Sequence, residues 1–138
     1  MKRYLLDTNI LTDFLNRRYG VEVVAEREKL AGCYIGTSIS VVGEMYFGAS
    51  RSDNPTHNRM LVRRGIERVT CWPFTLEAAE VFGNISAMLK SKGLLIQQVD
   101  MQTAAIALTL GNCTIVTTDS DFARIPGIVT ENWRLPSS

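Results

Sequence analysis

The stretch RYLLDTNIL, residues 3–11, sets a carboxylate between a short apolar strand and the start of a helix. Residues 3–6 are typical of a buried strand, and residues 8–18 carry apolar side chains at helical spacing. An aspartate at such a junction is either a helix cap or part of a site. The pattern of Asp7 alone leaves both interpretations open, and the rest of the chain has to decide between them.

The same alternation of strand and helix continues along the chain. Predicted helices span residues 21–31, 38–50, 53–66, 75–90 and 100–111, and predicted strands span residues 33–37, 67–72 and 113–118. Short apolar strands that alternate with helices are typical of an α/β fold, here a three-layer α/β/α sandwich around a central, mostly parallel sheet. No repeat or linker divides the sequence, so we expect one domain over residues 1–138.

The composition excludes several classes of protein. The net charge of +1 gives no overall sign of a nucleic-acid-binding or strongly acidic chain, although charge can still separate locally. The three cysteines are widely spaced and lack a C-x-x-C pair, which favours reduced, packed thiols over a metal or redox site. No stretch resembles a signal peptide or reaches the length of a membrane span. We therefore expect a cytoplasmic protein without membrane contact.

Four acidic residues are predicted to meet at one edge of the sheet. Asp7 and Asp119 each follow a strand, while Glu44 and Asp100 lie in the opening turns of helices. In right-handed β-α-β units, the carboxyl ends of strands and the amino ends of helices share one edge. Ligands bind at that edge in open α/β sheets.

Each acid also has an ordinary structural explanation. Asp7, Asp100 and Asp119 stand where aspartate caps a helix or closes a turn, and Glu44 could favour the helix dipole. Glu44 nevertheless has apolar neighbours on both sides, where an unpaired charge would be costly. Four like charges with no Lys or Arg beside them in sequence favour a bound cation.

The residue types indicate which cation this would be. Carboxylates without imidazole or thiolate suit Mg²⁺ or Mn²⁺ rather than zinc, and Mg²⁺ commonly shares its ligands with phosphate. The single histidine, His57, follows a proline-containing turn and is interpreted as a surface residue. Phosphoester chemistry is the natural use of such a site. Without metal, the cluster is expected to retain one or more protons.

Two further groups of residues bear on the substrate. Arginines gather around the first two strands, at positions 17, 18, 51, 59, 63, 64 and 68. They could bind phosphates that flank a phosphoester bond cleaved at such a site, or simply form solvated helix faces. Tyr46 and Phe47 are interpreted as core or dimer contacts rather than as platforms for stacked bases.

Four stretches in this order resemble the PIN-domain ribonucleases, most closely the VapC-type toxins of bacterial toxin–antitoxin pairs. They are YLLDTNIL, SVVGEMYFGA, QQVDMQTAAIAL and IVTTDSDFARIPGI, and the resemblance extends to the closing TENW at residues 130–133. It implies a parallel-sheet sandwich with an acidic pocket for Mg²⁺ or Mn²⁺, and endonucleolytic cleavage of RNA by a homodimer. It also implies a cognate VapB-like antitoxin, often with an arginine directed at the acids.

The resemblance assigns roles to particular residues. The catalytic and metal-binding acids of the family fall on Asp7, Glu44, Asp100 and Asp119. Asp121 could replace Asp119 or anchor the following turn, and Thr8, Asn9 and Thr118 are expected to hydrogen-bond the ligating carboxylates.

The resulting hypothesis is hydrolysis of RNA by a water activated on a metal held chiefly by Asp7 and Asp100. A catalytically silent binding module is an alternative, although all four acids are present. A phosphatase with Asp7 as nucleophile is a weaker alternative, because Asn9 occupies the position of that enzyme class's second aspartate. Motifs for other chemistries, such as a P-loop or G-x-S-x-G, are missing.

Overall fold

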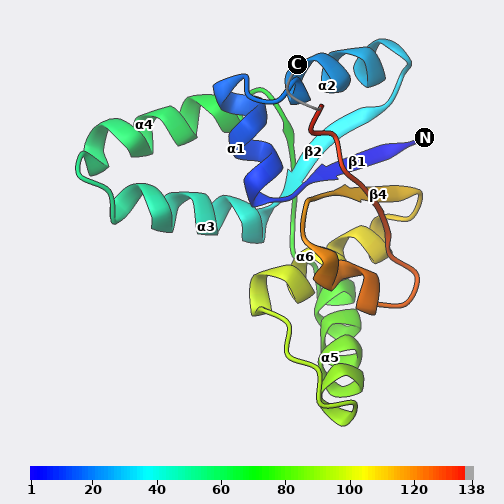
Figure 1. Cartoon of the computed structure of the whole chain (residues 1–138). Coiled ribbons are helices and arrows are strands. Elements are labelled where there is room, and N and C mark those ends of the chain that lie inside the picture. Colours follow the sequence, from blue (N-terminus) through cyan, green and yellow to red (C-terminus); the bar gives the residue numbers. More distant parts are fainter. Residues whose placement is uncertain (136–138) are drawn as a thin grey trace.

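A single five-stranded sheet forms the centre of the computed structural model, which describes residues 1–135 (Figure 1). Its strands are β1 (Arg3–Leu6), β2 (Tyr34–Ser38), β3 (Thr70–Trp72), β4 (Cys113–Val116) and β5 (Val129–Glu131). Their order is β3-β2-β1-β4-β5, and every neighbouring pair is parallel. The predicted mostly parallel sheet is confirmed.

Within residues 1–135, six α-helices and one 3₁₀ helix connect the strands. They are α1 (Thr8–Asn16), α2 (Val21–Leu30), α3 (Ile39–Ser50), α4 (Pro55–Ile66), α5 (Leu76–Ser91), α6 (Gln98–Leu110) and η1 (Ser120–Arg124). The helix predicted over residues 8–18 stops at Asn16, because Arg17 turns into the left-handed region with φ 55°. The strand predicted over residues 67–72 begins only at Thr70, since the preceding residues still form turn hydrogen bonds with α4.

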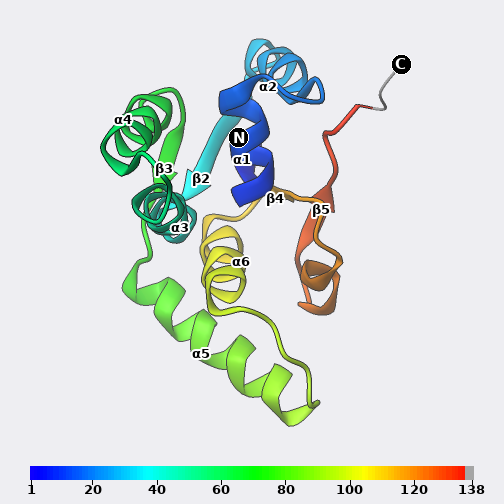
Figure 2. The same ribbon diagram turned by 60° about the vertical axis from the view of Figure 1, so that its left-hand side comes forward.

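Helices cover both faces of the sheet and create two cores (Figures 1 and 2). Side chains alternate across β1, so that Tyr4 and Leu6 pack with α1 and α2, while Leu5 faces α5 and α6. The apolar side chains of α1 and the alanine-rich face of α6 are thereby removed from water, which is the main stabilising term for such layers. Within the described residues, no helix combines the length and apolarity that a membrane crossing needs.

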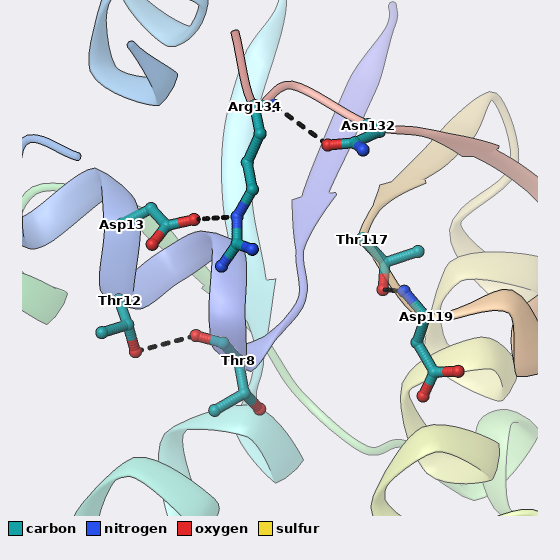
Figure 3. Close-up of polar contacts among 7 residues, drawn as sticks. All are labelled: Thr8, Thr12, Asp13, Thr117, Asp119, Asn132 and Arg134. Carbon is teal, nitrogen blue, oxygen red and sulfur yellow. Dashed lines mark hydrogen bonds and ion pairs between the residues drawn. The ribbon is translucent and has the colours of Figure 1, made fainter. Parts of the chain in front are cut away.

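The sequence prediction missed η1 and β5. The three residues of β5 are all exposed and form the edge of the sheet, so they show no apolar alternation. Trp133 follows β5, is buried, and packs against Tyr4 with ring centroids 4.9 Å apart. This tail brings Arg134 back to α1, where its Nε donates to Asp13 Oδ2 at 2.7 Å (Figure 3).

The order in which strands are added to the sheet reverses between β1 and β4. From β1 the chain builds outward through β2 and β3, and it then returns to the other side of β1 for β4 and β5. The carboxyl ends of β1 and β4 therefore lie side by side, and the Asp7 amide donates to the Val116 carbonyl at 3.0 Å. This is the topological switch point at which open α/β sheets form their ligand-binding crevice.

Candidate active site

Asp7 is a buried carboxylate and not a conventional helix cap. Its side chain is 6% exposed and makes no capping hydrogen bond to α1, although Asp7 occupies the N-cap position. Burial raises the pKa of Asp7, the Thr8 amide and the Thr117 hydroxyl act against that rise, and the charges of Glu44 and Asp119 add to it. The capping explanation for Asp7 is therefore wrong.

Thr117 orients Asp7. Its Oγ1 donates to Asp7 Oδ2 at 2.8 Å. The same oxygen accepts the Asp119 amide at 2.9 Å (Figure 3). Thr118, the residue predicted for this role, is exposed and makes no side-chain hydrogen bond within residues 1–135, and Thr117 was not predicted. The wrong threonine was predicted because the end of the strand was misplaced. The predicted strand reaches residue 118, whereas β4 stops at Val116.

Asp100 is the acid most affected by its surroundings. It lies half-buried in the first turn of α6. Burial raises its pKa to about 7, with further contributions from the charges of Asp7, Asp119, Glu44 and Asp121. These electrostatic couplings indicate that α1, α3, α6 and η1 bring their acids to one edge of the sheet. Asp100 therefore keeps its proton more readily than an ordinary aspartate.

Glu44 lies at the exposed border of this cluster. The Oγ1 atom of Thr8 donates to Glu44 Oε2 at 2.8 Å, linking α1 with α3. The apolar neighbours Val41 and Val42 are buried, but Glu44 is exposed. The expectation that Glu44 sits among buried apolar side chains is therefore wrong. Ser38, the N-cap of α3, fixes this helix to α6 through a 2.9 Å hydrogen bond with Thr103.

Asp119 and Asp121 form the last part of the cluster. Asp119 Oδ1 accepts the Asp121 amide at 2.8 Å, so Asp119 caps η1 as well as facing the other acids. Asp121 forms an ion pair with Arg124 at 3.8 Å. This pairing fits the role of a turn anchor for Asp121. Asn9, a predicted partner of the carboxylates, is exposed on α1.

The acids of residues 1–135 do not form a complete set of ligands for a cation by themselves. Within residues 1–135, no group of three or more His, Cys, Asp or Glu side chains is arranged to hold a metal ion. Mg²⁺, however, needs only one or two carboxylates, since it keeps several waters and shares phosphate oxygens. The donors are all carboxylate oxygens and their charges repel one another. This donor set fits a hard divalent ion.

Outside the cluster, the exposure of most residues fits what was predicted for them. His57 is exposed on α4, and the three cysteines are free and partly buried. Burial raises the pKa of Cys113 to about 11, which makes that thiol a poor nucleophile. Phe47 is 55% exposed beneath the guanidinium of Arg51, so of its two interpretations the core residue is wrong and the dimer contact stays a prediction.

Comparison with known proteins identifies the family. The model of the PIN domain matches residues 4–128, and the chain belongs to the PIN domain family. Within that family it is similar to ribonuclease VapC2 of Haemophilus influenzae, with 34% identity over 96% of this chain and 99% of the relative. It is also similar to the tRNA(fMet)-specific endonuclease VapC of Salmonella typhimurium, with 30% identity over 96% and 99% of the two chains.

Solved structures give the same result. A chain of VapBC2 from Rickettsia felis, bound to a DNA fragment from its promoter, matches 95% of this chain with a TM-score of 0.81 and 29% identity, and 98% of its own length is covered. VapBC-1 from nontypeable Haemophilus influenzae matches with the same TM-score at 27% identity, again over 95% of this chain and 98% of the other. The parallel sheet and its helices are thus those of VapC proteins.

Proposed function

We propose that this chain is a VapC-type endoribonuclease toxin that hydrolyses RNA phosphodiester bonds with a divalent cation, Mg²⁺ or Mn²⁺. The observation that carries the proposal is the mutual electrostatic effect of acids from four separate elements at the sheet's switch point. It is strongest at Asp100, whose pKa is raised to about 7 by burial and by neighbouring carboxylates. A cation would relieve this repulsion.

Asp7 and Asp100 are the proposed direct ligands. Asp7 is held in one orientation by Thr117, and Asp100 projects from the first turn of α6. Glu44 and Asp119 would complete or orient the site from positions that are each fixed by a hydrogen bond within the protein. When bound, the cation polarises the phosphate and lowers the pKa of a coordinated water. No carboxylate then has to act as the nucleophile.

The proposed partners follow from the relatives. Solved complexes of VapC relatives contain the VapB antitoxin, and we propose that a VapB-like antitoxin inhibits this chain. We also propose that the active form is a homodimer and that it acts in the cytoplasm, where its RNA substrate is found. Because a relative is named a tRNA(fMet)-specific endonuclease, initiator transfer RNA is the first defined substrate to test.

The test is cleavage by the purified chain in the presence of Mg²⁺ or Mn²⁺, with tRNA(fMet) and total cellular RNA as substrates. We expect cleavage to stop with chelator and to fall more than about a hundredfold in Asp7→Asn and Asp100→Asn, because metal-ion catalysis is lost. Asp53→Asn, which changes an exposed acid between α3 and α4, is the matched control and should cleave normally.

Circular dichroism has to show that each variant is folded. Undiminished cleavage by a folded Asp7→Asn, Asp100→Asn double variant would contradict the proposed site. A wild-type protein that cuts neither substrate with either metal would instead favour the catalytically silent binding module.

A further inference from the structure

Three helices enclose a groove that opens from the candidate active site. α1, α3 and α4 surround a volume of about 610 Å³, and they form three sides of a triangle in Figure 1. Thr8 and Glu44, which hydrogen-bond to each other, line the groove at the corner nearest the other acids. The groove is therefore continuous with the candidate active site.

The lining of the groove is mostly apolar and has spare room. Leu15, Met45 and Leu61 contribute apolar surface from the three helices. Gly48 leaves the wall of α3 open, since a Cβ there would meet no atom within 4 Å. Gly65 on α4 is different: a Cβ there would collide with Leu15. The open space at Gly48 thus belongs to the groove and not to a packing contact.

Positive charge lines the side of the groove formed by α4. Arg64 on α4 and Arg68 in the turn that follows α4 both contribute to the lining. Within residues 1–135, no carboxylate forms an ion pair with either of them. Both arginines are exposed, and the guanidinium of Arg68 lies 4.8 Å from the centroid of the Phe14 ring.

We infer that this groove binds a nucleotide of the RNA strand next to the cleaved phosphodiester, with its phosphate held by Arg64 and Arg68. The inference rests on the proposed function. Unpaired arginines suit phosphate, which they can hold with two hydrogen bonds. An unstacked base presents apolar faces that match the groove's apolar wall, as in other recognition of single-stranded RNA. The volume also falls in the usual range for small-ligand pockets.

The wall also offers polar groups that could recognise base edges. Asn58 donates to Ser52 Oγ at 2.7 Å, which holds its side chain in place and leaves its amide oxygen as an acceptor. Asn16 contributes a second amide from the end of α1. Base preference beside the cleavage point is the property expected to depend on these two residues.

The first experiment measures binding of a fluorescent, mixed-sequence single-stranded RNA by anisotropy. All variants are made in an Asp7→Asn background, so that the RNA stays intact. Arg64→Ala is expected to weaken binding about tenfold and to reduce the slope of affinity against salt by about one, because one phosphate contact is lost. Arg63→Ala is the matched control: Arg63 is exposed on α4 but does not line the groove, and we expect a change within about twofold.

The second experiment fills the groove. Gly48→Leu is expected to fold, because the site is open and Leu favours helix more than Gly does. It should weaken RNA binding about tenfold by occupying the base's space. Gly83→Leu is its control, since Gly83 is exposed on α5, equally open, and outside the groove.

The outcomes separate this inference from the proposed function. If Gly48→Leu and Arg64→Ala bind RNA like the parent while wild-type protein cleaves RNA, the groove is not part of the RNA path and the inference is overturned. A groove reserved for a protein inhibitor would give that result. If wild-type protein cleaves no RNA, the proposed function fails first, whatever the binding data show.

Discussion

The hydroxyl of Thr117 influences the pKa of the buried carboxyl of Asp7. Thr117 lowers the pKa of Asp7, opposing the larger effect of burial. We expect Thr117→Val to raise the pKa of Asp7 and to lower the cleavage rate by about 10- to 100-fold, the usual cost of losing a residue that orients a metal ligand. Initial rates with saturating metal would measure this effect.

Thr118→Val is the matched control, because Thr118 is exposed and its side chain makes no hydrogen bond to Asp7. Equal losses of activity in the two valine variants would show that the Thr117 hydroxyl has no special role.

Ionised Asp100 should lower the free energy of unfolding of the metal-free protein. Its pKa is raised from 3.8 to about 7 on folding. The folded state therefore binds the proton of the Asp100 carboxyl more tightly than the unfolded chain does. The stability that this protonation contributes is lost as the pH rises through 7. At pH 8, Asp100→Asn removes the buried charge and is expected to increase the free energy of unfolding by about 1–2 kcal/mol, allowing for partial exposure.

Urea unfolding at pH 8 and at pH 5 measures this difference. The gain should be largest at pH 8 and should shrink towards pH 5, where Asp100 is protonated in the folded protein. A variant less stable than the parent at pH 8 would contradict the raised pKa.

At the scale of elements, residues 132–135, the tail that follows β5, connect to α1 and to the turn between α1 and α2. Asp13 is 3% exposed and its Oδ2 accepts the Arg134 Nε at 2.7 Å, while the Arg134 guanidinium lies 4.7 Å from the Tyr19 ring centroid. The Leu135 amide also donates to the Tyr19 carbonyl at 2.8 Å. The tail thus fixes α1, which carries Thr8 at the candidate active site.

Removing one partner of this pair should be costly. Arg134→Met keeps most of the side-chain length but leaves the Asp13 carboxylate buried and unpaired, and we expect a loss of about 2–3 kcal/mol in the free energy of unfolding. Arg27→Met is the control, since the Arg27–Glu28 pair is 3.7 Å apart and its arginine is well exposed. Chemical denaturation should show almost no change for the control. Similar stabilities of the two variants would mean that the tail contact contributes little.

At the scale of the whole molecule, metal binding should depend on pH because folding gathers acids from separate elements. One proton has to leave Asp100 before the acid can bind a cation, so the affinity for Mn²⁺ should fall about tenfold for each pH unit below 7. Isothermal titration at pH 6, 7 and 8 would measure this dependence. In Asp100→Asn the dependence should be much weaker, and an unchanged affinity of the parent from pH 8 to 6 would contradict it.

The edge of the sheet on which the acids lie could be predicted from local patterns. Apolar runs and helical spacing located β1, β2 and β4 and most of the helices, because those elements bury one face or both. Once the alternation implied a parallel sheet, Asp7, Asp100 and Asp119 had to lie near one edge. The prediction of β5 failed because its exposed residues carry no such signal.

The sequence by itself determined the α/β layers and the side of the sheet that carries the acids, since periodicity and strand direction act over a few residues at a time. Only the tertiary structure decided that Thr117 rather than Thr118 contacts Asp7, that Arg134 pairs with Asp13, and that three helices leave a groove at Gly48. The first two contacts join residues 110 and 121 positions apart. Local patterns carry no information about such pairs, because their geometry is set by the packing of whole elements.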